Sequence, residues 1–191
     1  VKDGRVSVFG KNVCAYDDED LRHRIGYVQQ KAVLFQGTVR SNLLWGDDSA
    51  SDDDLRTALS TAQVLDIVAD KGGLDAPVEQ NGANFSGGQK QRLSVARALV
   101  RKPQILVLDD SSSALDYATE AAMRKAILAL PYKPTLFIVS QRASSVMCAD
   151  RILVLEDGRL VGDGTHKALL ANCPAYCEIY HSQFSEEVTD A

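Results

Sequence analysis

Two short apolar runs separated by a helical stretch constrain the fold of this chain more than any other feature. Gln104–Leu108 and Thr135–Val139 are rich in branched residues and are followed by polar ones, a pattern typical of strands buried on both faces. Ala114–Leu130 lies between them, has helical spacing and stops at Pro131. Two strands joined by a helix predict a parallel β-sheet, so we expect an α/β fold.

Other patterns add elements around this sheet. Arg5–Phe9 and Ile25–Val28 have the character of short strands. Ile152–Leu155 and Leu160–Val161 flank an Asp-Gly turn, which predicts an antiparallel hairpin. Helical patterns cover three further ranges, Asp52–Val68, Gln89–Val100 and His166–Ala171. The apolar residues that share related faces of the crossover helix are Ala118, Ala121, Ala122, Ala126 and Leu130.

The composition narrows the class of protein. The 191 residues are 45% hydrophobic and carry a formal net charge of -5, which suits one globular domain and argues against nucleic acid as a partner. The apolar runs are far shorter than the roughly 20 residues of a membrane-spanning helix. The cysteines match no disulfide or zinc spacing, which favours mostly buried free thiols in a reducing compartment. A start without Met or signal peptide leads us to expect a longer parent protein.

A glycine-rich helix start is the first candidate site. Ser86 is suited to cap a helix, and Gly87 and Gly88 would let a ligand approach its first turn closely. The unpaired amides and the dipole of such a turn favour a phosphate. An ordinary helix start is the alternative interpretation.

A pair of acids is the second candidate site. Asp109 and Asp110 follow a predicted parallel strand, at the sheet edge where α/β folds bind ligands. The Asp109 carboxylate suits Mg²⁺ on a nucleotide, while Asp110 would face an attacking water. A role in capping the next loop is the alternative for both.

Several motifs in order resemble those of the nucleotide-binding domain of ATP-binding cassette (ABC) transporters, over nearly the whole chain. Gln30 resembles the Q-loop glutamine, Ser86–Gln89 the signature and Asp109 the Walker B aspartate. Ser113–Asp116 resembles the D-loop, and Gln141 stands where the switch histidine belongs. The resemblance implies a P-loop NTPase-like α/β fold, with a mostly parallel sheet core and a helical lobe at about residues 52–102 that carries the signature.

The resemblance also implies cofactors and roles for individual residues. ATP and Mg²⁺ are the expected cofactors, with Gln30 and Asp109 at the metal and Asp110 and Gln141 at the catalytic positions. The residues expected to contact nucleotide are Gln30, Ser86, Gly87, Gly88, Gln89 and Asp116. We expect the cassette domain to cover residues 1–184, followed by a loose acidic tail at 185–191.

Two stretches resemble the exporter-type branch of the family. Val33–Leu43 resembles the segment that faces intracellular coupling helices, and Val78–Gly82 resembles the exporter X-loop, with Gln80 in place of the usual acid. The resemblance implies transmembrane domains as partners and a location at the cytoplasmic face of the cell membrane. The alternative interpretation of each stretch, from its residues alone, is an ordinary surface loop.

Three departures from the family pattern bear on mechanism. No GxxxxGK[ST] phosphate loop is present, since Gly10-Lys11 is followed by Asn12, so we expect an N-terminally truncated domain. Asp110 replaces the usual catalytic glutamate and Gln141 the switch histidine. These changes resemble the degenerate half of heterodimeric bacterial exporters, whose partner is a second, different nucleotide-binding domain. The alternatives are a slow homodimeric ATPase, a cassette ATPase acting on DNA or the ribosome, and a non-functional fragment.

Overall fold

The computed structural model describes residues 4–111 and 114–184. The expected acidic tail and Ser113 of the expected D-loop lie outside the described residues. The chain divides into two compact units, Val1–Val139 and Ser140–Ala191, which are described separately.

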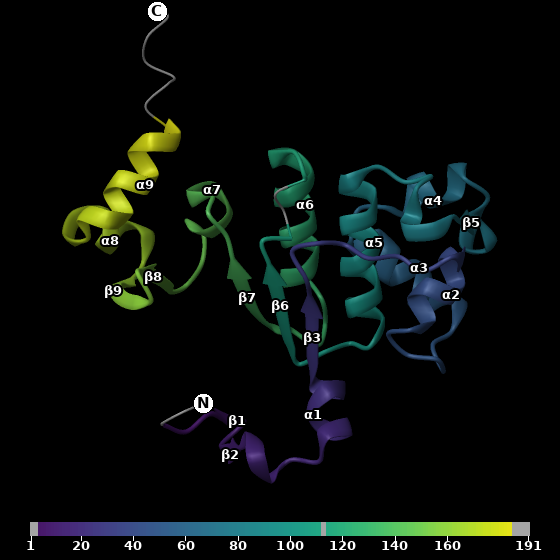
Figure 1. Cartoon of the computed structure of the whole chain (residues 1–191), viewed down its shortest axis with the longest axis horizontal. Coiled ribbons are helices and arrows are strands. Elements are labelled where there is room, and N and C mark those ends of the chain that lie inside the picture. Colours follow the sequence, from purple (N-terminus) through teal and green to yellow (C-terminus); the bar gives the residue numbers. More distant parts are fainter. Residues whose placement is uncertain (1–3, 112–113, 185–191) are drawn as a thin grey trace, which may run out of the picture. The chain divides into compact units, whose positions relative to one another are not determined.

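A three-stranded parallel sheet forms the centre of the first unit. Its order is β3 (Ile25–Val28), β6 (Ile105–Asp109) and β7 (Thr135–Val139), with Tyr27 opposite Val107 and Val107 opposite Phe137 (Figure 1). The crossover connection between β6 and β7 contains α6 (Tyr117–Leu128). The expected parallel sheet and crossover helix are confirmed. The helix begins later than Ala114 because Asp116 is its N-cap residue.

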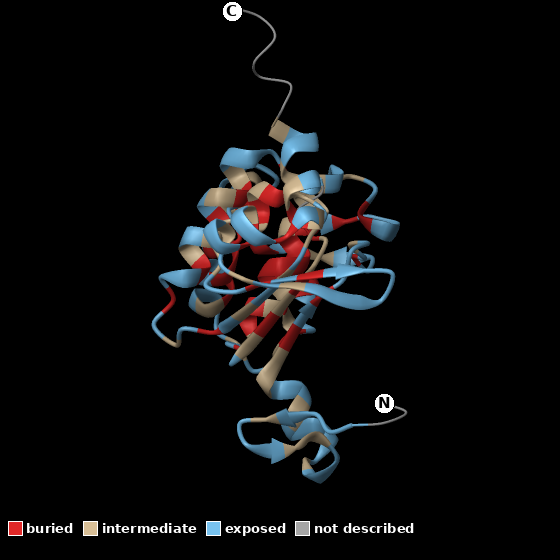
Figure 2. Ribbon diagram, turned by 90° about the vertical axis from the view of Figure 1, so that its left-hand side faces the viewer, coloured by how far each residue is buried: buried red, intermediate tan, exposed pale blue. Residues whose placement is uncertain are grey.

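Only one face of this sheet is buried, so the expectation of strands buried on both faces is wrong. Val28, Leu106 and Leu108 belong to the same buried core as residues of α5 (Gly87–Val100) and α6 (Figure 2). Residues at the alternate positions point to the opposite face, where Tyr27 and Phe137 remain 53% and 54% exposed. The difference arises because both helices cover the same face.

Of the five residues that the sequence places on related faces of the crossover helix, Leu130 is buried, two residues beyond the end of α6. The buried residues of α6 are Glu120, Met123 and Ile127, whereas Ala118 and Ala122 are exposed. Larger side chains at this spacing fill the space above the sheet, which alanine methyl groups would leave empty. The buried Glu120 carboxylate lies 3.7 Å from the Arg124 guanidinium, one helical turn away.

A helical region is inserted between β3 and β6 and packs on α5. Its elements are β4 (Gly37–Thr38), α2 (Val39–Leu44), α3 (Asp52–Thr61), α4 (Leu65–Asp70), η2 (Gly73–Asp75), β5 (Pro77–Val78) and η3 (Gln80–Gly82). The single helix expected over Asp52–Val68 is therefore two helices. Gln63 separates them with a φ of 58°, a left-handed conformation that a helix cannot continue through.

The chain before the sheet forms small elements. They are β1 (Ser7–Val8), paired antiparallel with β2 (Lys11–Asn12), then η1 (Val13–Ala15) and α1 (Asp18–Arg24). The strand expected over Arg5–Phe9 is thus present in shortened form.

The second unit is built on the expected antiparallel hairpin, which is confirmed. It comprises α7 (Ala143–Val146), β8 (Ile152–Glu156), β9 (Arg159–Gly164), α8 (His166–Asn172) and α9 (Pro174–Phe184). Its core contains Ile152, Val154, Leu169, Cys173 and Tyr176.

All four cysteines of the chain are free, but Cys14 and Cys148 are exposed, so the expectation of mostly buried thiols is wrong. Within the described ranges, no helix is long and apolar enough to cross a membrane.

Candidate nucleotide site

The carboxyl ends of β3 and β6 bring the predicted acids together with two side chains from β3 and its continuation. Asp109 is the last residue of β6, and its carboxylate accepts a hydrogen bond of 2.5 Å from the Tyr27 hydroxyl. This bond to a carboxylate raises the pKa of Tyr27. In β6, Val107 precedes Asp109 by two positions, so the two side chains point to the same face of the sheet. Tyr27 pairs with Val107 and therefore lies on that face as well.

Asp110 leaves the strand in a left-handed conformation, with a φ of 43°. Its amide donates to the Val139 carbonyl at 2.8 Å, which fixes the backbone at this point. Its carboxylate accepts a 3.0 Å hydrogen bond from the Gln30 side-chain amide. We call Tyr27, Gln30, Asp109 and Asp110 the acid cluster. It lies at the sheet edge where α/β proteins bind ligands.

The donor atoms of the acid cluster fit Mg²⁺ bound to a nucleotide. Magnesium prefers oxygen ligands and is commonly held by one or two carboxylates together with substrate phosphates. Asp109 supplies a carboxylate, and Gln30 retains a side-chain oxygen when its nitrogen bonds Asp110. Among the described residues, no group of three or more His, Cys, Asp and Glu side chains could hold a metal by itself.

The signature turn forms a capped helix start. The Ser86 hydroxyl accepts from the Gln89 amide at 3.3 Å, and the Gln89 side chain accepts from the Ser86 amide at 3.0 Å. Ser86 and Gly87 are exposed. A Cβ atom on Gly88 would lie 2.9 Å from the Ala114 carbonyl, so the turn packs directly on the chain that leads into α6. The capping role expected for Ser86 is confirmed, and phosphate binding at this turn stays a prediction.

Asp116 and Gln141 have local structural partners. The Asp116 carboxylate caps α6 by accepting from the Thr119 amide at 2.9 Å, and this bond lowers the pKa of Asp116. The Gln141 carbonyl accepts from the Gln183 side chain at 2.8 Å, inside the second unit. The structure thus brings Gln30, Asp109 and Asp110 together, and the nucleotide roles of Asp116 and Gln141 stay predictions.

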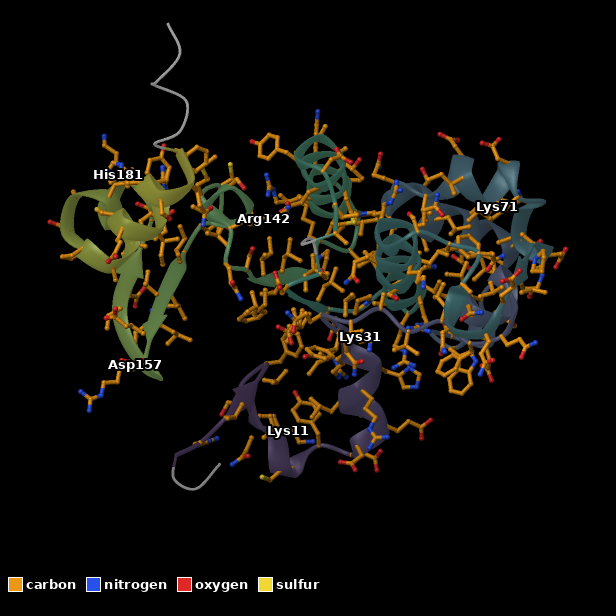
Figure 3. All side chains as sticks on the ribbon, turned by 45° about the horizontal axis from the view of Figure 1, so that its top comes forward. Lys11, Lys31, Lys71, Arg142, Asp157 and His181 are labelled. Carbon is orange, nitrogen blue, oxygen red and sulfur yellow. The ribbon has the colours of Figure 1, made fainter. Side chains whose placement is uncertain are left out.

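The two exporter-like stretches meet in space. Gly37 of β4 pairs with Val78 of β5, and Leu34 packs where a Cβ atom on Gly82 would lie. Asn84 holds the second stretch by bonding the Pro77 carbonyl at 2.8 Å. Lys71, labelled in Figure 3, donates in turn to the Asn84 carbonyl.

A cleft opens beside the first of these stretches. The Phe35 and Trp45 rings stack with centroids 4.7 Å apart, and Trp45 is 66% exposed. Together with β3 and α5 they line a cavity of about 430 Å³. The charged residues that line it are Lys31, Arg97 and Arg101, all basic.

Sequence reasoning did not identify Tyr27 as a member of the acid cluster. The sequence did contain a signal: Tyr27 lies three residues before Gln30, on a strand that pairs with the strand of Asp109. Sequence reasoning also missed Gln91, which is 4% exposed and donates to the Gln29 carbonyl at 3.2 Å. An amide at a core position of a helix was the available signal, because a buried amide needs a partner.

The parallel sheet with acids at its strand ends and the inserted helical region with a glycine-rich helix start define a cassette-type nucleotide-binding domain. The family model described as "ABC transporter" matches residues 1–113. The chain therefore belongs to the ABC transporter family, and it has the fold of the ATP-binding domain of an ABC exporter.

Relatives and a solved structure support this assignment. The chain is 46% identical over 189 residues to "Uncharacterized ABC transporter ATP-binding protein YfiB" of Bacillus subtilis, covering 98% of this chain and 33% of that protein. It is 38% identical to the "ATP-dependent lipid A-core flippase" of Haemophilus ducreyi, covering 97% and 32%. A bacterial Atm1-family ABC exporter solved with ATP bound matches with a TM-score of 0.89 and 35% identity, covering 95% and 32%. The chain spans about a third of the length of these relatives.

Proposed function

We infer that this chain is the ATP-binding part of an ABC exporter and acts as one half of a pair of such domains. Its likeness in sequence and fold to exporters supports the transport class. In the pair, ATP with Mg²⁺ is gripped by the Walker motifs of one domain and by the signature turn of the other. Hydrolysis of ATP, in which its terminal phosphoryl group is transferred to water, drives export.

The chain's own site is the degenerate one, and the bond between Gln30 and Asp110 carries this proposal. A glutamate would extend its carboxylate one methylene further, about 1.5 Å, than aspartate does. Asp110 is shorter and engages the Gln30 amide at 3.0 Å. Water would be poorly polarised, since a misplacement of about 1 Å can cost a hundredfold in rate. Gln141 keeps a hydrogen-bond donor but lacks an imidazole that takes up charge.

The signature turn of this chain serves the partner's site. Ser86 and Gly87 are exposed at the start of a 14-residue helix, so first-turn amides and the positive end of the helix dipole are available to a phosphate. The partner domain would supply the phosphate loop and catalytic glutamate of that site. The pair is therefore a heterodimer with one slow and one active site.

The cleft beside Phe35 and Trp45 is the surface we assign to a coupling helix of the transmembrane domains. Its aromatic pair fits apolar side chains of a helix, and its basic residues Lys31, Arg97 and Arg101 fit an acidic side chain on that helix. With a coupling helix docked on this surface, the domain would act at the cytoplasmic face of the cell membrane.

The test compares two substitutions in the full-length exporter assembled with its partner. Asp110→Glu is expected to leave ATP turnover nearly unchanged, because the active site lies on the other domain. Ser86→Trp is expected to lower turnover about a hundredfold, because the indole blocks the partner's nucleotide. Ser60→Trp, at an exposed position of α3, is the control for a bulky substitution.

The opposite ranking of the two substitutions would refute the heterodimer assignment. Brisk ATP turnover by the full-length protein without a second subunit would support a homodimeric ATPase instead. Absence of turnover in the assembled pair would refute the ATPase function itself.

A further inference from the structure

Two side chains of α5 and that of its C-cap residue, Arg101, hold the segment that follows β3, residues 29–46. The Gln91 amide donates to the Gln29 carbonyl at 3.2 Å, and the Arg97 guanidinium donates to the Val33 carbonyl at 3.0 Å. Arg101 donates to the Gly46 carbonyl at 2.6 Å. We call Gln91, Arg97 and Arg101 the α5 clasp. Its members lie within about 120° around the helix, given 100° per residue.

The segment and α5 are also in close contact through their backbones. A Cβ atom on Gly46 would lie 2.2 Å from the Arg97 carbonyl. Within β3 itself, a Cβ atom on Gly26 would lie 3.3 Å from the Ala98 carbonyl. Burial lowers the pKa of Arg97, which lies beneath the Phe35 ring. The contact leaves no space for sliding, so the segment must move with α5.

Gln91 is the member of the clasp nearest to the acid cluster. It bonds the backbone of Gln29, and the next residue, Gln30, donates to Asp110 at 3.0 Å. On its own helix, Gln91 lies little more than one turn beyond Ser86 of the signature turn. Because Gln91 is 4% exposed, loss of its bond would leave the Gln29 carbonyl without this partner.

We propose that Gln91 is a positioning residue that sets the Gln29 backbone so that the Gln30 amide reaches Asp110. It thereby ties the helix of the signature turn to the acid cluster of the same chain. The proposal rests on the proposed function, in which the signature turn contacts the nucleotide of the partner's site. Gln91 then links the two nucleotide sites of the pair through one side chain.

The experiment uses the full-length exporter with its partner and the substitution Gln91→Met, which keeps the side-chain length and removes the donor. Hydrogen–deuterium exchange is measured without nucleotide. The amides of β3 (Ile25–Val28), which pairs with β6, are expected to exchange about tenfold faster, while those of α5 keep their rate. Gln63→Met is the matched control, because the Gln63 side chain is exposed and donates to the Ser60 carbonyl at 3.0 Å, within its own turn.

A double-mutant cycle supplies the second readout. Gln91→Met is expected to weaken ATP binding at the chain's own site about fivefold, but by less than about twofold when Gln30 is already alanine. Effects of Gln91→Met and Gln30→Ala that multiply fully would overturn the proposal, as would unchanged exchange in β3. Faster exchange throughout α5 would assign Gln91 a general structural role and would also overturn it.

Gln91→Leu is the second variant, and it must reproduce the exchange pattern. Failure of both variants to fold would overturn the proposal, because Gln91 would then be required for folding rather than for positioning. The exchange measurement needs no ATP turnover. An exporter without ATPase activity would therefore refute the proposed function while leaving the exchange test valid.

Discussion

Three glycines of the first unit differ in the space available for a methyl group, and substituting each by alanine tests the backbone contacts of α5. On Gly46 the Cβ atom would lie 2.2 Å from the Arg97 carbonyl, on Gly88 2.9 Å from the Ala114 carbonyl, and on Gly87 3.9 Å from the Ala114 side chain. None of the three has a left-handed φ, so backbone strain does not enter the comparison.

The contact distances set the order of the effects. In Gly46→Ala the methyl group must move from 2.2 Å to at least the 3.4 Å of an ordinary contact, about 1.2 Å, against backbone inside a 14-residue helix. We expect a loss of about 3 kcal/mol, the upper end for overpacking. In Gly88→Ala the clash is smaller, and a gain in helix propensity of about 1 kcal/mol offsets part of it. We therefore expect a net loss of stability of about 1 kcal/mol. Gly87→Ala is expected to be neutral or slightly stabilising.

The assay is urea denaturation followed by the fluorescence of Trp45, the single tryptophan. Its stacking partner is Phe35, and it directly precedes Gly46, so it reports on this region. A Gly46→Ala variant as stable as the wild type would refute the close approach of the segment to α5. A Gly87→Ala variant less stable than Gly88→Ala would refute the packing of the signature turn on Ala114.

Two further predictions concern α6. Ile127→Ala is expected to destabilise the fold by about 4 kcal/mol, because Ile127 is fully buried. Leu128→Ala, at a position 59% exposed, is the control and is expected to change the stability by less than about 0.5 kcal/mol. Thermal denaturation measures both. The bond from Thr119 lowers the pKa of Asp116, so the ionised carboxylate stabilises the fold above its unfolded pKa of about 3.9, and this contribution is lost as the pH falls through the lower folded pKa. The difference in unfolding free energy between wild type and Asp116→Ala is therefore expected to be present at pH 7 and to shrink as the pH falls below the unfolded pKa of about 3.9.

Local patterns predicted most of the regular elements. The parallel pair β6 and β7, the helix α5 and the hairpin of β8 and β9 follow from apolar runs, a Ser-Gly-Gly start and an Asp-Gly turn. The split between α3 and α4 was not predictable, because the pattern of apolar residues continues across Gln63, whose left-handed φ depends on its surroundings. The buried residues of α6 were not predicted from its alanines, because alanine fits a helix surface as well as a core.

The candidate site was predictable in its parts but not in its contacts. Asp109, Gln30 and Ser86 were each identified from motifs in order along the chain. The bond from Gln30 to Asp110 joins residues 80 positions apart in the sequence, and the bond from Gln91 to Gln29 joins residues 62 apart. Nothing in the periodicity of either segment specifies these partners.

The sequence by itself determined most of the segments that form strands and helices, and the acids, amides and glycines at their ends, because these depend on near neighbours along the chain. Only the tertiary structure decided which face of the sheet is covered, that Tyr27 reaches Asp109, and that α5 holds the backbone beyond β3. Those outcomes depend on the register between strands and on the close approach of backbones, which require the whole unit to be packed.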